Sequence, residues 1–354
     1  MRLIASAVAL SVIVAIALVV GVRAWQATHR SPLQQALDLA PKDAARYSWT
    51  DWQAIRSALA VTGTGTDADE KLLDKGYDAD LTPASSITSS VDTLREAFGF
   101  SPATMSSELL TQSTTGAALF IRVEDSVSFD AIRSHLSDAG FAPPSSNRGV
   151  WDGSDVAGVG PVPILGFVAL DPSSHLVVTS DSSSFLTDTI AHLGDGEVAT
   201  PIAQVAAQVG SPLAAELYDG DYTCSHLAMA NANATDQAQG EQLIADAGTV
   251  SPVLAFAMAD LPWPDGTAAP ERDSHRTVRV AMAFADHGQA KVNATTRAKL
   301  ATGDAPGQGG TFSDRFRLGE VAARGSVVTM DLDAQADAPV LSDLSTGPLL
   351  FATC

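Results

Sequence analysis

The chain has 354 residues, of which 45% are hydrophobic, so it can bury a sizeable core and is not an intrinsically disordered protein. Its 41 acidic residues outnumber the 21 basic residues, and the net charge is −20 at pH 7. Because binding to a phosphate backbone depends on clustered Lys and Arg, this balance argues against nucleic acid as a partner.

The first element is an uncharged apolar run at residues 3–22, LIASAVALSVIVAIALVVGV. A helix of this length spans about 30 Å, the thickness of one hydrocarbon core. Trp25 follows the run and suits the interfacial aromatic belt. We therefore predict a transmembrane signal anchor over residues 1–25. A cleaved signal peptide is the alternative, because a Val-x-Ala pattern ends at Ala24.

The orientation of this anchor is not decided by charge, because Arg2 and Arg23 flank the run on both sides. The sequence has no second apolar span, and its two cysteines form an even number, as in exported proteins. We therefore expect a single-pass protein of the cell membrane whose C-terminal body is extracytoplasmic. If the signal is cleaved, the protein is secreted instead.

Residues 26–92 are predicted to form a juxtamembrane helix followed by a loop rich in Ser, Thr and Asp. In WTDWQAIRSAL, Thr50 is the expected N-cap, and Gln53 completes a capping box. Trp52, Ile55 and Leu59 share one face of this helix. That face is expected to pack on the protein's own domain, and recognition of a partner is the alternative. The composition of residues 61–92 predicts a loop.

Two α+β units are predicted to follow, at residues 93–204 and 205–354, each with an antiparallel sheet and helices. Local similarities suggest that the second unit repeats the first. They align residues 116–125 with 277–286, VVTSD at 177–181 with VVTMD at 327–331, and 185–188 with 340–343.

Between the matched segments, four further elements are predicted. They are a helix that begins in TPIAQVAAQV, a strand from Cys224 to Ala230, a helix from about Thr235 and a strand within VLAFAMADL, which leads to the loop PWPDGTAAPERDSH.

Catalytic signatures are absent from the sequence. No Gly-x-Ser-x-Gly pentapeptide occurs, and the seven histidines are scattered without His-x-x-x-His spacing. An active site assembled from distant residues stays open, because such sites are defined by geometry. Asp155, Asp219 and Asp221 near His226 are the first candidates for it.

No cofactor or metal is predicted. The acidic run from Asp67 to Asp80 lacks the order of an EF-hand loop, and GDAPGQGG lacks the Lys-Ser/Thr of a phosphate-binding loop. Cys224 and His226 are too few ligands for a metal site.

Cys224 and Cys354 could be free thiols, lipid-attachment sites, metal ligands or a disulfide. Cys354 has no residues after it, as prenylation requires, and neither cysteine directly follows the apolar run. In an oxidising compartment a pair of cysteines usually forms a disulfide. We therefore predict a Cys224–Cys354 disulfide that holds the C-terminus to the second unit.

Several segments together resemble a family of uncharacterised membrane-anchored or exported proteins of high-GC Gram-positive bacteria. They are LAPKDAARYSWTDWQAIR, YDADLTPASSI, FGFSPATMSSELL, LYDGDYTCSHLAMAN and LSDLSTGPLLFATC. The resemblance covers nearly the whole chain after residue 33. It implies an exported α+β protein and supplies no activity, cofactor or catalytic residue.

These observations predict a membrane-anchored extracytoplasmic protein that acts as a binding or interaction module at the cell envelope. Its expected partners are the lipid bilayer, through the N-terminal helix, and an unknown envelope protein or ligand. An extracytoplasmic hydrolase and a structural envelope component are the alternatives. The sequence leans against an enzyme without deciding the question.

Overall fold

The computed structural model describes residues 30–146, 149–194, 198–263, 276–335 and 338–354. The predicted signal anchor at residues 1–25 lies outside this part of the chain, as do His29 and His275. Within the described ranges, no helix is both long enough and apolar enough to cross a membrane.

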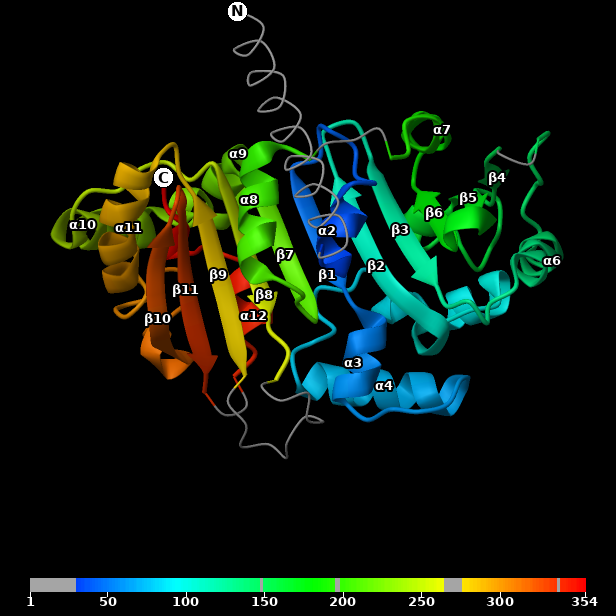
Figure 1. Cartoon of the computed structure of the whole chain (residues 1–354), viewed down its shortest axis with the longest axis horizontal. Helices are drawn as coiled ribbons and strands as arrows, with labels where there is room; N and C mark the ends of the chain where they lie inside the picture. The colour runs from blue at the N-terminus through cyan, green and yellow to red at the C-terminus, as the bar shows by residue number, and fades with distance from the viewer. Residues whose placement is uncertain (1–29, 147–148, 195–197, 264–275, 336–337) are drawn as a thin grey trace, which may run out of the picture.

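The strands form one 11-stranded sheet in the order β10-β11-β9-β8-β7-β1-β2-β3-β6-β5-β4 (Figure 1). Neighbouring strands are antiparallel throughout, which confirms the predicted α+β class with antiparallel strands. The strands are β1 (Arg46–Thr50), β2 (Met105–Gln112), β3 (Ala117–Val123), β4 (Trp151–Asp152), β5 (Phe167–Asp171), β6 (Leu176–Ser180), β7 (Ala214–Asp219), β8 (Ala255–Asp260), β9 (Thr277–Ala283), β10 (Phe316–Arg324) and β11 (Val327–Ala334).

Helices cover both faces of this sheet. They are α2 (Pro32–Leu37), α3 (Trp52–Ala58), α4 (Thr66–Asp78), α5 (Val91–Thr93), α6 (Phe129–Ala139), α7 (Ser183–Ala191), α8 (Thr200–Val209), α9 (Gly220–Tyr222), α10 (Ala234–Ala247), α11 (His287–Leu300) and α12 (Val340–Ser345). In Figure 1, α2 and α8 lie in front of the central strands, and α12 lies behind β8 and β9.

The strand order is symmetrical about the β1–β7 pair. From β1 the sheet continues outward through β2 and β3 to β6 and β5, and from β7 it continues through β8 and β9 to β11 and β10. A helix follows the third strand in each direction, α6 after β3 and α11 after β9. Both predicted units therefore share one sheet, and the predicted boundary at 204/205 falls inside α8.

The sequence matches between the two halves differ in register by one residue. Phe120 pairs with Val178, whereas Ala281, its counterpart in the first match, pairs with Thr329. The match of residues 177–181 with 327–331, however, aligns Val178 with Val328, which is one residue away from Thr329. Because successive side chains of a strand point to opposite faces, the two matches cannot belong to one superposition.

The prediction for residues 26–92 is wrong in two places. Residues 46–50 form the central strand β1, and residues 66–78, predicted as loop, form helix α4. The helix buries Ala68 and Leu72, a narrow apolar stripe in a polar segment.

Helix α3 packs on the protein's own core, as expected. Trp52 and Ile55 are fully buried in it, and Leu59 at its C-cap is buried beside them. Its N-cap differs from the prediction: Asp51, not Thr50, accepts a hydrogen bond from the backbone N–H of Ala54 at 2.9 Å. Thr50 is the last residue of β1 and cannot cap the helix.

The predicted strand from Cys224 to Ala230 is also wrong. The strand of this region is β7, and Thr223–Leu227 form a π-helical turn. The side chain of Asp219 caps the preceding helix α9 by accepting from the N–H of Tyr222 at 2.6 Å, and the π-helical turn continues directly from α9. The predicted helix near Thr235 and the strand within VLAFAMADL are confirmed as α10 and β8.

The two faces of the sheet bury different cores. The face under α2, α7 and α8 carries one apolar cluster that runs from Phe120 through Trp49 to Ala281. The opposite face carries two clusters, one under α3, α4 and α6 and one under α10, α11 and α12. On this second face the central strands place polar side chains between the clusters. We call these side chains the polar seam: Ser48, Thr50, Glu108, Glu216 and Asp260.

Candidate functional site

The polar seam follows from strand register. Thr50 pairs with Glu108 on one side and with Ala214 on the other, and Ala214 pairs with Asp260. Cross-strand partners point to the same face, so these four residues form one row across β2, β1, β7 and β8. Glu108 is 1% exposed and Asp260 is 0% exposed. Two carboxyl groups are thus buried in the middle of the sheet.

Glu108 has neutral hydrogen-bond donors around it. The backbone N–H of Ser86 donates to Oε1 at 2.8 Å, and Trp52 Nε1 donates to Oε2 at 3.2 Å. Burial in this environment raises the pKa of Glu108 to about 7, and the hydrogen bonds only partly oppose the effect. This carboxyl group therefore changes charge near neutral pH.

Glu216 is buried with a cation nearby. Its Oε2 accepts from Ser48 Oγ at 2.9 Å and from Tyr218 Oη at 3.3 Å, and Arg46 Nε lies 3.4 Å away. Burial raises the pKa of Glu216, and the positive charge of Arg46 opposes this change. This cluster fixes the two central strands to each other.

Asp260 lies against Arg276, which reaches across to the first half of the chain. Arg276 Nε is 2.8 Å from Asp260 Oδ1, and Nη2 donates to Asp80 Oδ2 at 2.9 Å. The ion pair with Asp260 is close but poorly aligned, because neither carboxyl oxygen has a hydrogen bond of good geometry within the described chain. Burial raises the pKa of Asp260, opposed by Arg276.

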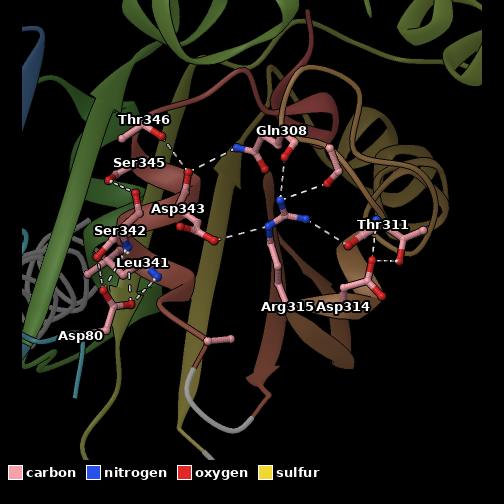
Figure 2. A network of polar contacts seen from close by, with 12 residues as sticks. Asp80, Gln308, Thr311, Asp314, Arg315, Leu341, Ser342, Asp343, Ser345 and Thr346 are labelled. Atoms are coloured by element: carbon pink, nitrogen blue, oxygen red, sulfur yellow. Dashed lines mark hydrogen bonds and ion pairs between the residues drawn. The ribbon is translucent and has the colours of Figure 1, made fainter. Parts of the chain in front are cut away.

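Asp80 also holds helix α12. Its Oδ2 accepts from the backbone N–H of Leu341 at 2.8 Å, and Ser342 donates to Oδ1 through its hydroxyl group (Figure 2). Burial raises the pKa of Asp80, while Arg276 and these donors lower it. Asp80 therefore joins the end of α4 to the start of α12.

Arg315 anchors the same helix from its other side. Its guanidinium group donates to the carbonyl oxygens of Gln308, Gly309 and Thr311 at 2.9 to 3.1 Å and lies 3.4 Å from Asp343 Oδ2 (Figure 2). Asp80 and Arg315 thus both hold the first turn of α12 by polar contacts.

A cleft with a volume of about 1150 Å³ opens beside this network, between α4 and the start of α12. Both halves of the chain contribute to it. It is lined by Leu59, Leu73, Asp74, Lys75, Tyr77, Asp78, Ala79, Asp80, Thr82, Pro83, Thr88 and Ser89 from the first half and by Trp263, Arg276, Ala334, Gln335, Ala338, Pro339, Ser342 and Asp343 from the second. A concave surface with apolar, aromatic and a few polar groups is typical of a ligand site.

The cations of this cleft are already engaged. Lys75 Nζ donates to the carbonyl oxygen of Leu59 at 3.0 Å, and Arg276 is bound as described above. Asp74 and Asp78 are exposed and have no ion pair within the described residues. The cleft therefore presents negative charge.

The predicted disulfide between Cys224 and Cys354 is present, with a Cα–Cα distance of 5.7 Å. Arg297, which is 0% exposed, supports the same C-terminal segment. It donates to the carbonyl oxygens of Phe351 at 3.0 Å and of Thr353. Burial lowers the pKa of Arg297 to about 9. The C-terminus is thus held by a covalent bond and by a buried cation.

The residues predicted for a distant-residue active site are not assembled into one. Asp219 is engaged as the cap of the turn, and His226 Nδ1 lies 2.7 Å from Ser225 Oγ, its ring stacked on Tyr222. Asp155 lies in the loop after β4, at the far edge of the sheet. Within the described chain, no hydrogen bond or ion pair joins His226 to any of the three carboxylates.

Within the same residues, no group of three or more His, Cys, Asp or Glu side chains could hold a metal ion. The residues that line the cleft were not predicted as a site. Asp74, Asp78 and Asp80 belong to the acidic run of the sequence, Trp263 lies in the predicted loop PWPDGTAAPERDSH, and Arg276 directly follows that loop.

No family model matches the chain, and no curated protein matches it. Solved structures of TP0453 are similar to it at 8% sequence identity. Crystal form III has a TM-score of 0.41 and covers 88% of this chain and 98% of that one; form IV has a TM-score of 0.40, with 89% and 100% covered. At these values the similarity carries no functional assignment.

Proposed function

We propose that this protein is a binding module of the cell envelope and that its ligand occupies the cleft between α4 and α12. The observation that supports this function is the cleft itself, which is large enough for a small molecule or a peptide segment and is lined by both halves of the chain. Asp80 and Arg276 form part of its wall and are already held in place by neighbouring groups. A fixed wall favours binding, because less conformational entropy is lost on association.

We propose an extracytoplasmic location for this module, either anchored by residues 1–25 or secreted after cleavage within that segment. The Cys224–Cys354 disulfide supports this location, because disulfides persist in oxidising compartments and are rare in the cytosol. We also propose that the two halves arose by duplication, a view that the symmetrical strand order supports.

A hydrolase is less well supported than a binding module. Three carboxyl groups with raised pKa, those of Glu108, Glu216 and Asp260, are buried in the sheet and do not line the cleft. Asp80 also has a raised pKa and does line the cleft, but Arg276, Leu341 and Ser342 already bind its oxygens. Catalytic acids and bases need contact with a substrate. Their positions therefore favour a role in stability.

Hydrogen–deuterium exchange tests the proposed site. The folded protein is incubated with an extract of the envelope of its own cells, and we expect slowed exchange in residues 73–89 and 338–343. Ser89→Trp places a bulky side chain at an exposed position on the cleft wall and should abolish the protection. Ser137→Trp, exposed on α6, is the matched control and should preserve it.

Two results would refute the proposal. One is protection that is identical in Ser89→Trp and wild type. The other is a lack of any protection in the cleft segments, which would favour a structural envelope component. Hydrolysis of an envelope component by the wild type would favour the enzyme.

A further inference from the structure

We propose that the ligand of the cleft is a cationic peptide segment with apolar side chains. This inference rests on the proposed function, since it names the chemistry of what the same cleft binds. It is carried by three features of the lining: the unpaired charges, an unused hydrogen-bond donor and exposed aromatic surface.

The charges favour a cation. Arg276 is surrounded by Asp80, Asp260 and two carbonyl oxygens, and Lys75 is bound to the carbonyl oxygen of Leu59. Arg276 is therefore not free to bind an anionic ligand, and the exposed ammonium group of Lys75 is a single positive charge beside the two exposed carboxylates of Asp74 and Asp78. Asp74 and Asp78 lie one helical turn apart on α4, so their carboxylates project from neighbouring positions. A Lys or Arg side chain can pair with them.

The unused donor favours a peptide backbone. Trp263 Nε1 is screened from solvent and has no acceptor within the described chain. A buried donor without a partner is costly, and a carbonyl oxygen of a bound peptide would satisfy it once the half-buried indole ring shifts towards the cleft. Peptides present a carbonyl oxygen at every residue, whereas a simple amine or metal cation presents none. The cleft thus offers groups for both the charge and the backbone of a peptide.

The exposed ring of Tyr77 favours a ligand that also carries apolar side chains. This side chain is 77% exposed and lines the cleft together with Leu59, Leu73 and Pro83. Apolar side chains of a ligand can cover this surface, and a cation over the ring gains a cation–π interaction. The net charge of −20 on the whole chain also accelerates the approach of a cationic partner at low salt.

Binding of a synthetic probe tests this chemistry. The probe is an octapeptide of alternating Lys and Leu with blocked ends, and its affinity is measured by calorimetry at low and physiological salt. A peptide of alternating Glu and Leu is the charge control. We expect Asp74→Asn/Asp78→Asn to weaken binding of the Lys peptide about 10-fold, the effect of losing two exposed ion pairs.

A remote pair controls for net charge. Asp138→Asn/Asp155→Asn removes the same two charges from exposed positions outside the cleft and should change the affinity less than about 2-fold. Trp263→Phe keeps the aromatic ring, removes the donor and should weaken binding without altering its salt dependence. Thermal unfolding of each variant shows whether it is folded.

The results separate this inference from the proposed function. If envelope extract protects the cleft but the Lys peptide fails to bind, or binds equally to both double variants, the cationic peptide is refuted and the binding module stands. If an anionic or uncharged ligand protects the cleft, the inference is likewise overturned. If nothing protects the cleft, both proposals fail.

Discussion

Glu108→Gln gives the sharpest test of the buried polar seam. Gln has nearly the shape of Glu and carries no charge at any pH, but its one carbonyl oxygen can accept from only one of Ser86 and Trp52, which donate to different oxygens of Glu108. The substitution therefore removes the ionisation together with one hydrogen bond, and only the loss of ionisation changes the pH dependence of stability.

The magnitude follows from the pKa of Glu108. Burial raises it from 4.5 to about 7, so the folded protein binds a proton that the unfolded chain has already released. The stabilisation from this proton is complete below pH 4.5 and is lost as the pH rises to about 7. Each pH unit in this interval costs roughly 1.4 kcal/mol, and the total loss is about 3 kcal/mol.

The assay is denaturant unfolding at several pH values from 4 to 8.5, for wild type and variant. At pH 4 Glu108→Gln should be less stable than the wild type by about 1–3 kcal/mol, the cost of the donor left without an acceptor. Between pH 4 and pH 8 the difference should change by up to about 3 kcal/mol in favour of the variant, because only the wild type loses stability as Glu108 ionises. Asp260 titrates in both proteins, so the difference between them isolates Glu108.

Glu241→Gln is the matched control, because this glutamate is exposed on α10. Its curve should follow that of the wild type. If Glu108→Gln also ran parallel to the wild type across the pH range, Glu108 would not have a raised pKa, and the reasoning about the seam would be refuted.

Three further predictions concern contacts that hold distant parts of the chain together, and urea unfolding measures all of them. Cys224→Ser should lose up to about 5 kcal/mol of stability, because the disulfide links residues that are 130 positions apart. Reductant should lower the stability of the wild type but not that of this variant. Asp80→Ala should cost about 3–5 kcal/mol in the same assay, because Arg276 loses a buried partner, whereas Asp78→Ala on the exposed surface should change stability by less than about 0.5 kcal/mol. Arg297→Lys should cost about 2 kcal/mol or more, because a single ammonium group cannot reach all the carbonyl oxygens that the guanidinium group holds.

Each of these has a contradicting result. A wild type indifferent to reductant would show that the disulfide adds no stability. Equal losses for Asp80→Ala and Asp78→Ala would remove the special role of Asp80. If Arg297→Lys were as stable as the wild type, the hydrogen bonds from the Arg297 guanidinium group to the carbonyl oxygens would not be needed for stability.

Helices and strands could be predicted from the sequence where the signal lies within the element itself. The strand at Ala255–Asp260 is a short apolar run, and α10 begins after the capping side chain of Asn233, so both were placed from sequence. The disulfide could be predicted because the sequence has only two cysteines and the apolar run at residues 3–22 led us to expect export.

The central position of β1 could not be recognised, because it depends on pairing with β2 and β7, which lie far away in the sequence. A local signal for the strand itself was present but was missed: Tyr47 and Trp49 alternate with Ser48 and Thr50, so one face is apolar and the other belongs to the seam. The turn at Thr223–Leu227 was missed for a different reason. The side chain of Asp219 caps α9 directly before this turn, and that local hydrogen bond starts a helical backbone where the pattern indicated a strand.

The cleft could not be predicted either. Its two walls join residues 59–89 with residues 263–343, and no spacing rule connects them. Asp80 was visible only as one of several acidic loop residues, although it is the residue that fixes α12. A site formed between two halves of a chain has no local motif.

The measurement that tests the central claim most directly is hydrogen–deuterium exchange of residues 73–89 in the presence of envelope extract, in wild type and Ser89→Trp. We predict slowed exchange of this segment in the wild type and in Ser137→Trp, and none in Ser89→Trp. Equal exchange in all three proteins, with and without extract, would contradict the claim that the cleft is a binding site.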